Sequence, residues 1–177
     1  MLFANTSIEK TKAGRYKVSQ TDLKSNAVNP SPLLDSIEFR ENQLTPEEYL
    51  HLRSQVNWKR LSPAQAQLAL ANSLYILGAY ANGELVGMGR IVGDGAVICY
   101  IQDLIVAPTL QGSGLGSALL NRLKAYVESL RLPHTEMMLD LMCAKGREAF
   151  YEKHGFLARP TETLGPGMII YLKDEAL

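Results

Sequence analysis

The feature that most constrains this chain is a glycine-rich loop between a strand-like apolar run and a long amphipathic helix. Residues 97–106 form the apolar run, and after Pro108 the chain passes through Gln111-Gly112-Ser113-Gly114-Leu115-Gly116. A helix leaves its first N–H groups unpaired, and its dipole places partial positive charge at the same end. Glycines let a ligand approach the backbone without a Cβ in the way. The stretch therefore predicts a phosphate-binding loop at a helix N-terminus.

The spacing of the glycines excludes two common phosphate-binding motifs. A P-loop requires G-x-x-x-x-G-K-[ST], but Ser117 and Ala118 follow Gly116, and no lysine is present. A dinucleotide-binding fold requires G-x-G-x-x-G, whereas the glycines here occupy positions 112, 114 and 116. The pattern that fits is Q-x-x-G-x-G after a strand that ends in V-x-P.

This pattern resembles the GNAT superfamily of acyl-CoA-dependent N-acyltransferases. Val106-Ala107-Pro108 and Gln111 through Gly116 carry the first match, and Phe150-Tyr151-Glu152-Lys153-His154-Gly155-Phe156 carries the second. Both occur in the order and separation of that family, and the resemblance spans roughly residues 36–173. It implies an α/β fold with a mixed, strongly twisted central sheet and helices on both faces.

Local sequence signals predict the positions of most helices and strands. Thr45-Pro46 and Ser62-Pro63 are helix starts, with a capping residue followed by proline at the first helical position. Asn82-Gly83 between two apolar runs predicts a β-hairpin. The predicted helices cover 46–56, 63–71, the stretch from the glycine loop to Pro133, and 145–153. The predicted strands cover 36–40, 74–80, 84–92, 97–106 and 136–142, with a final antiparallel pair at 156–159 and 167–173.

Composition narrows the class of protein. At 177 residues the chain is long enough for one substantial core, which we place at 35–177. Its formal net charge of +0 provides no basic field for nucleic acid, and no apolar run approaches the length of a membrane span. Neither nucleic acid nor a membrane is therefore an expected partner, and we predict a cytoplasmic protein.

Residues 1–34 read as a polar N-terminal extension without sustained periodicity. It is either a flexible tail or a segment strapped onto the domain. Its basic residues also allow a transit-peptide interpretation, but Glu9 and Asp22 interrupt that pattern.

The resemblance implies acetyl-CoA as co-substrate, bound along residues 104–116. Phe150 is expected either to pack on the pantetheine arm or to be a plain core residue. The family often has an asparagine near the start of the last helix, but the corresponding residue here is Ala144, which is a departure from the pattern. The predicted cofactor-binding residues are Leu104, Ile105 and Val106, mainly through backbone N–H groups, together with Gln111, Gly112, Ser113, Gly114, Leu115, Gly116 and Phe150.

Tyr151 is the first predicted catalytic residue. It lies four residues before Gly155, where many family members carry a tyrosine that protonates the sulfur of the departing CoA. A tyrosine pKa of about 10 suits a general acid at neutral pH. The alternative is a tyrosine that only packs in the core.

Asp103 is the second predicted catalytic residue, because a carboxylate inside an apolar strand is costly unless it is paired or functional. By alternation it shares a face with Ile101 and Ile105, whereas Gln102 points to the other face. Asp103 would attract the substrate ammonium group or accept its proton through water. The alternative is a structural partner for Arg90 or for a backbone turn.

The resemblance implies that the two helices after residue 45 form a wall of the acceptor site. Trp58, Arg90 and Asp103 are therefore the predicted substrate-binding residues. Trp58 has a second interpretation, as a half-buried aromatic residue that packs the helix pair together.

No metal and no covalent acyl-enzyme is predicted. The three histidines, His51, His134 and His154, lack metal-ligand spacing. Cys99 and Cys143 lie in apolar runs and are expected to be buried, reduced core residues.

These features predict an N-acetyltransferase that acetylates a small primary amine, with an aromatic amine as one option. Acetylation of protein N-termini or lysines is the alternative acceptor class. The alternative from another class is a non-catalytic acyl-CoA-binding module. The sequence leaves a monomer and a homodimer open.

Overall fold

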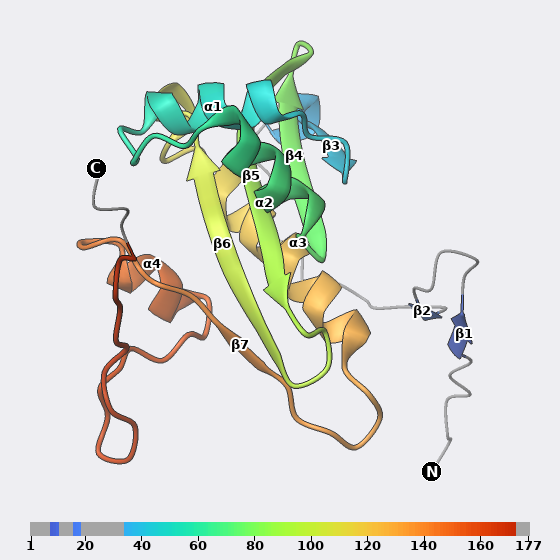
Figure 1. Ribbon diagram of the computed structural model, residues 1–177, viewed down its shortest axis with the longest axis vertical. Helices are drawn as coiled ribbons and strands as arrows, with labels where there is room; N and C mark the ends of the chain where they lie inside the picture. The colour runs from blue at the N-terminus through green and yellow to red at the C-terminus, as the bar shows by residue number, and fades with distance from the viewer. Residues whose placement is uncertain (1–7, 11–15, 19–33, 173–177) are drawn as a thin grey trace. The chain divides into compact units, whose positions relative to one another are not determined.

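The computed structural model describes residues 8–10, 16–18 and 34–172 (Figure 1). The chain divides into two compact units, with the boundary after Leu139, and each is described by itself. The elements are β1 (Ile8–Lys10), β2 (Tyr16–Val18), the 3-10 turn η1 (Leu34–Ser36), β3 (Glu38–Glu41), α1 (Pro46–Gln55), α2 (Pro63–Ala71), β4 (Tyr75–Ala81), β5 (Glu84–Gly93), β6 (Ile98–Val106), the 3-10 turn η2 (Pro108–Leu110), α3 (Leu115–Leu130), β7 (Met138–Asp140) and α4 (Glu148–Lys153).

Five strands form one sheet in the order β3-β4-β5-β6-β7, and β1 and β2 form a separate antiparallel pair. Each of the pairs β3–β4, β4–β5 and β5–β6 is antiparallel. Asn82 and Gly83 join β4 to β5, and their φ angles are positive, at 51° and 83°. Positive φ at both residues is what a two-residue type I′ hairpin turn requires, so the predicted hairpin is confirmed.

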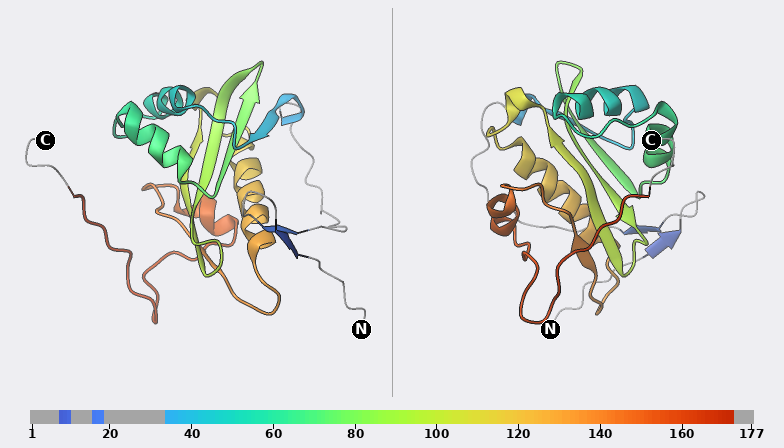
Figure 2. Two further views of the ribbon diagram at one scale, coloured as in Figure 1. Left: turned by 45° about the vertical axis from the view of Figure 1, so that its right-hand side comes forward. Right: turned by 60° about the vertical axis from the view of Figure 1, so that its left-hand side comes forward.

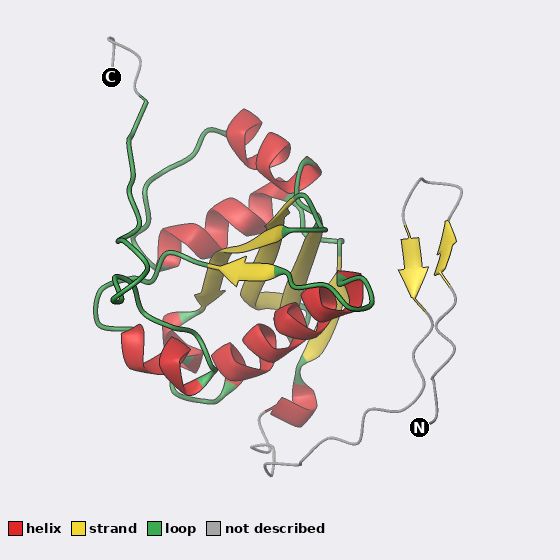
Figure 3. Cartoon of the chain, turned by 90° about the horizontal axis from the view of Figure 1, so that it is seen from below, coloured by secondary structure: helices red, strands yellow, loops and turns green. Residues whose placement is uncertain are grey.

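Helices cover both faces of this sheet, as predicted (Figures 2 and 3). On one face, a Cβ added to Gly89 would lie 2.6 Å from Leu123 Cδ1 of α3. A Cβ added to Gly87 would lie 3.0 Å from Leu119 Cδ1 of the same helix. Met88, between the two glycines, points to the opposite face and packs in the cluster beneath α1 and α2. The two glycines therefore allow α3 to pack closely on β5.

Replacing Gly89 with alanine tests this close approach. Because the new Cβ would clash with Leu123, we expect the free energy of unfolding to fall by about 1–3 kcal/mol. The matched control is Gly165→Ala, where a Cβ meets nothing within 4 Å. Urea denaturation measures both variants, and equal midpoints would contradict the close packing of α3 on β5.

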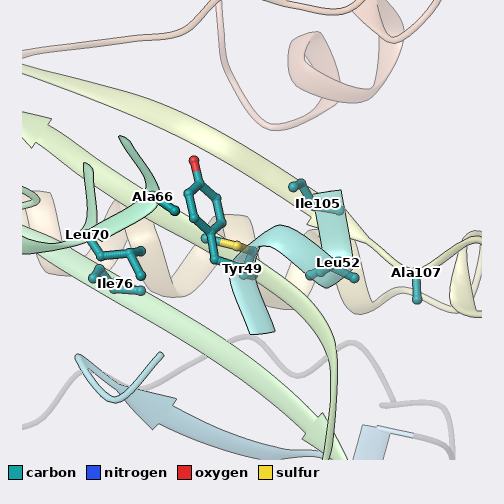
Figure 4. Packing of buried hydrophobic residues seen from close by; sticks show 8 residues of the cluster. Tyr49, Leu52, Ala66, Leu70, Ile76, Ile105 and Ala107 are labelled. Carbon is teal, nitrogen blue, oxygen red and sulfur yellow. The ribbon is translucent and has the colours of Figure 1, made fainter. Parts of the chain in front are cut away.

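The core on the other face is formed by buried side chains from α1, α2 and the sheet. The cluster contains Tyr49, Leu52, Ala66, Leu70, Ile76, Met88, Ile105 and Ala107. In Figure 4 the Tyr49 ring lies among the aliphatic side chains, and its hydroxyl oxygen points away from them.

Local capping explains why α1 and α2 begin where they do. Thr45 Oγ1 accepts from the Glu48 N–H, while the Glu48 carboxylate accepts from the Thr45 N–H. Ser62 and Gln65 form the same reciprocal pair at the start of α2. These are capping boxes, and both predicted helices are confirmed almost to the residue.

The C-terminal part differs from the prediction. The helix begins at Glu148 instead of 145, and β7 is shorter than predicted. Residues 156–172 contain no strand, so the predicted final pair is wrong over this range; Lys173 lies outside the described residues. The Thr161 hydroxyl accepts from the N–H groups of Thr163 and Leu164, and such local bonds compete with a sheet ladder.

The apolar run 168–172 is exposed, with Leu172 90% accessible. Its β propensity predicted a strand, but propensity alone forms no strand without a paired neighbour. The predicted extension 1–34 lies mostly outside the described residues, and the boundary at residue 34 stays a prediction.

Candidate active site

Strand β6 contains a β-bulge at its centre. Met88 pairs with Ile105 and Arg90 pairs with the residue at 102, so Gly89 alone faces both Asp103 and Leu104. Asp103 adopts a positive φ of 58°, which is uncommon outside glycine but tolerated by aspartate. Two residues opposite one define a bulge, which bends the strand and redirects its side chains.

The bulge directs Asp103 into a buried cluster of polar side chains. Its Oδ1 accepts hydrogen bonds from Arg53 Nη1 at 2.7 Å and from Gln102 Nε2 at 3.0 Å. Its Oδ2 accepts one from Arg90 Nε at 2.7 Å and a short one from the Tyr49 hydroxyl. The Asp103 side chain is fully buried, and each arginine side chain is 11% exposed.

This arrangement favours a structural role for Asp103. A carboxylate has about four lone-pair positions, and four donors occupy them here. Two guanidinium groups also outweigh the single carboxylate, which does not favour binding of a substrate ammonium group, and the catalytic and substrate-binding roles of Asp103 stay predictions. The alternative interpretation of Asp103, as a structural partner for Arg90, is confirmed as far as this contact is concerned.

The position predicted for Gln102 is wrong. Its amide bonds to Asp103, so both side chains lie on the same face. The simple alternation of faces fails because the bulge inserts one extra residue into β6.

The cluster connects both helices of the α1–α2 face to β6. Arg90 Nη1 donates to the Ala69 carbonyl at 3.3 Å and to Ser73 Oγ at 3.1 Å, at the end of α2. Tyr49 belongs to α1; burial, together with the neighbouring Asp103 carboxylate, raises its pKa to about 12. The tyrosine therefore stays protonated and remains a hydrogen-bond donor to Asp103 well above neutral pH.

Trp58 lies in the loop between α1 and α2 and is 37% exposed. The guanidinium carbon of Arg53 lies 5.1 Å from the centre of its ring. The Trp58 ring is therefore exposed to solvent, and its role, either in the acceptor site or in packing the helix pair together, stays a prediction.

The glycine loop has the geometry that a phosphate site needs. Gly112 and Gly114 adopt positive φ angles of 80° and 92°, and Gly114 is the N-cap of α3. A Cβ at Gly112 would meet nothing within 4 Å, so the backbone is open on that side. Gln111 Nε2 donates to the Val106 carbonyl at 3.2 Å and ties the loop to the end of β6. No acidic residue lies in the first turn of α3 to repel an anion.

Gly114→Asp tests this loop. The change adds a Cβ and a negative charge at the N-terminus of α3, where a pyrophosphate is expected. Among the described residues the Cβ would approach only Leu34 Cδ1, at 3.6 Å, but aspartate at a φ of 92° is strained, so we expect a folded protein with reduced stability. Acetyl-CoA affinity measured by calorimetry should fall at least about tenfold.

The control for this variant is Gly83→Asp, which makes the same change at another positive-φ glycine in the β4–β5 turn. This control should keep its affinity for acetyl-CoA. Unchanged affinity in a folded Gly114→Asp protein would argue against phosphate binding at α3.

The remaining predicted residues lie on α4, in the second unit. The Tyr151 ring makes edge-to-face contacts with Phe150 at 5.1 Å and with Phe156 at 5.9 Å between ring centres. Phe150 also contacts His154 in the same manner, at 4.8 Å. Gly155 ends the helix with φ 88°, in the left-handed conformation predicted for it. Both aromatic residues are half-buried, and their catalytic and cofactor-binding roles stay predictions.

The cysteines do not have the character of activated nucleophiles. Both are free thiols, with Cys99 buried. The prediction that Cys143 is buried is wrong, because it is exposed beyond the short strand β7. Partial burial and the nearby carboxylates of Glu148 and Glu152 raise the pKa of the Cys143 thiol. Neither thiol is therefore favoured as a thiolate.

Among the residues that the structure describes, no three His, Cys, Asp or Glu side chains are grouped to hold a metal ion. None of the described helices has the length and apolar character that crossing a bilayer requires.

Sequence reasoning missed two members of the polar cluster, Tyr49 and Arg53. They are four residues apart on α1 and therefore share a helix face, but no local pattern connects them to Asp103, which lies 50 residues after Arg53 and 54 after Tyr49. Asp140, at the end of β7, was also missed. Its buried Oδ1 has no hydrogen-bond partner among the described residues, and burial raises its pKa.

The bulged strand that leads into a glycine loop at a helix N-terminus agrees with the resemblance to acyl-CoA-dependent N-acyltransferases. Comparison with known proteins identifies the family. The model of the acetyltransferase (GNAT) family matches residues 36–156, so the chain belongs to this family and is an N-acetyltransferase. The family generally uses acetyl-CoA.

Individual relatives agree with this family. Over 141 residues the chain is 28% identical to the uncharacterized N-acetyltransferase ycf52 of Pyropia yezoensis, covering 74% of this chain and 79% of that protein. It is 33% identical to the chloroplastic GCN5-related N-acetyltransferase 3 of Arabidopsis thaliana, over 43% of this chain and 30% of that protein. A GNAT-family acetyltransferase structure from Streptococcus pneumoniae is 27% identical, with a TM-score of 0.64, covering 78% of this chain and 99% of the other.

Proposed function

We propose that this chain transfers the acetyl group of acetyl-CoA directly to a small primary amine. The observation that carries the proposal is the continuity from the bulge at Asp103 to the N-cap of α3 at Gly114. Along this stretch a bent strand leads within a few residues into an open glycine loop. The two parts suit the two ends of acetyl-CoA, the thioester beside the strand and the phosphates at the helix.

The reaction joins the amine nitrogen to the acetyl carbonyl carbon and breaks the carbon–sulfur bond. The amine loses a proton, and the sulfur leaves as the CoA thiol. In this proposal the backbone N–H groups of Ile105 and Val106 orient the acetyl carbonyl. Tyr151 donates the proton to the departing sulfur. The raised thiol pKa values of both cysteines support direct transfer instead of an acyl-enzyme.

The acceptor side is proposed to lie against the α1–α2 face, where Trp58 presents part of its ring to solvent. An exposed indole ring suits a flat, apolar substrate group, which supports an aromatic amine as one option. Asp103 is not assigned the role of base, because its carboxylate is occupied by four donors. Within the proposal, Arg90 contributes through its bond to Asp103 instead of through direct contact with substrate.

The test is release of free CoA thiol from acetyl-CoA that depends on an added amine. A panel should include small aromatic amines, small aliphatic amines, and peptides with a free N-terminus or a lysine. Turnover with small amines is the expected result. Turnover with peptides alone would move the acceptor class to protein N-termini or lysines. Acetyl-CoA binding without turnover on any amine would favour the non-catalytic binding module.

A cytoplasmic location is the proposed compartment. A chloroplast is the alternative, which the chloroplastic relative from Arabidopsis thaliana supports. Fractionation of the source cells with an antibody against the protein distinguishes the two.

A further inference from the structure

Arg53 contacts both the bulge in β6 and the loop between α1 and α2. One end of its guanidinium, Nη1, bonds to Asp103 Oδ1 at 2.7 Å. Its other terminal nitrogen, Nη2, donates to the Lys59 carbonyl at 3.0 Å. The same group lies 5.1 Å from the centre of the Trp58 ring. A single planar group thus connects the cofactor strand to the loop that carries the exposed aromatic ring.

The remaining nitrogen of this side chain indicates what holds it in place. Arg53 Nε is buried and has no hydrogen-bond partner among the described residues. An unsatisfied buried donor is destabilising, so the position of the side chain does not arise from satisfying all of its donors. It is maintained by the contacts at the two terminal nitrogens. Because the guanidinium is rigid and planar, a shift at one terminal nitrogen moves the other.

We propose that Arg53 is a positioning residue that couples the 56–62 loop to the bulge in β6. The inference rests on the proposed function, in which acetyl-CoA lies beside residues 104–106 and the amine lies beside Trp58. Arg53 then sets the spacing between the two substrates. Such spacing matters for rate, because misplacement by about 1 Å can reduce turnover about 100-fold.

The chain provides its own reporter for this coupling. Trp58 is the only tryptophan, so the tryptophan fluorescence of the protein comes from the 56–62 loop alone. If acetyl-CoA binding shifts the bulge, Arg53 should transmit the shift to Trp58. The emission of the wild-type protein should then change as acetyl-CoA is added, with the affinity that calorimetry measures.

The test variant is Arg53→Met, and the matched control is Arg60→Met. Methionine keeps much of the aliphatic volume, and Arg90 remains to neutralise Asp103, so we expect Arg53→Met to fold. Arg60 is exposed and lies two residues after Trp58, so its replacement removes a nearby positive charge without touching the cluster.

We expect Arg53→Met to bind acetyl-CoA but to lose the change in Trp58 emission. Its kcat/KM for the amine should fall about 10- to 100-fold, while its KM for acetyl-CoA moves little. Arg60→Met should retain both the emission change and the wild-type kcat/KM. If Arg53 were purely structural, its replacement would lower thermal stability. It would not lower kcat/KM for the amine while leaving the KM for acetyl-CoA unchanged.

Arg53→Lys is the second variant, for use if the methionine protein does not fold. Lysine keeps the charge beside Asp103 but cannot hold the carboxylate and the Lys59 carbonyl in one plane. It should therefore also lose the emission change. An emission change that persists in a folded Arg53 variant would overturn the coupling. So would wild-type protein that binds acetyl-CoA by calorimetry without any emission change. Wild-type protein that does not bind acetyl-CoA would instead refute the proposed function, and the coupling would fall with it.

Discussion

Asp103→Asn should lower the free energy of unfolding by about 3–5 kcal/mol, because it leaves Arg53 and Arg90 buried without a compensating negative charge. Asparagine keeps nearly the same size and tolerates the positive φ at this position, so the loss would come from charge and hydrogen bonding. Urea denaturation at neutral pH, with a constant slope, measures the change.

Glu38→Gln is the matched control for this variant. It also removes a carboxylate bonded to an arginine, but the Glu38 side chain is 62% exposed and the pair lies in solvent. We expect little change in stability for such an exposed pair. Wild-type stability in Asp103→Asn would contradict the electrostatic account of the cluster. Unchanged stability with a large loss of turnover would return Asp103 to a catalytic role.

Tyr151→Phe should reduce kcat by about 10²–10⁴-fold if the hydroxyl protonates the departing sulfur. The change removes one oxygen and keeps the ring, so the edge-to-face contacts with Phe150 and Phe156 should persist. The KM for acetyl-CoA should move little, because the lost interaction belongs mainly to the transition state. The decline of rate at high pH should also lose the step that tyrosine ionisation causes. Single-turnover measurements are the proper readout, since product release can hide the chemical step.

Tyr171→Phe provides the control, because it removes the hydroxyl of an exposed tyrosine in the same unit. It should leave the single-turnover rate unchanged. A wild-type single-turnover rate in Tyr151→Phe would show that water or the amine's own proton serves the sulfur. Tyr151 would then contribute only packing.

The parts of the fold that local chemistry determines could be predicted from the sequence. Thr45 and Ser62 each have a capping partner three residues later, so the helix starts depend on a few adjacent residues. The turn at Asn82-Gly83 depends on two residues that tolerate positive φ. The glycine loop falls into the same group, since its glycines and the following helix are adjacent in the chain.

The parts that depend on distant partners could not be predicted. The sequence marks Asp103 as unusual, but its partners Tyr49 and Arg53 lie 54 and 50 residues earlier on a different element. The bulge that turns Asp103 toward them depends on pairing with β5, which alternation of faces in one strand does not reveal. The exposed run 168–172 makes the opposite point, because a strong local preference for strand did not produce one.

Four donors occupy the Asp103 carboxylate, and this arrangement also limits which substitutions the protein can accept during evolution. Loss of Asp103 leaves two buried positive charges, and replacing either arginine with an acid places two buried carboxylates together. The cluster draws one residue from each of three elements, with Asp103 on β6, Arg53 on α1 and Arg90 on β5. The balance of charge in the cluster therefore depends on all three elements. Related proteins should therefore either keep the residues at these three positions or replace them together, while neighbouring surface positions vary independently. Deep mutational scanning should find their single substitutions depleted and selected paired substitutions restored.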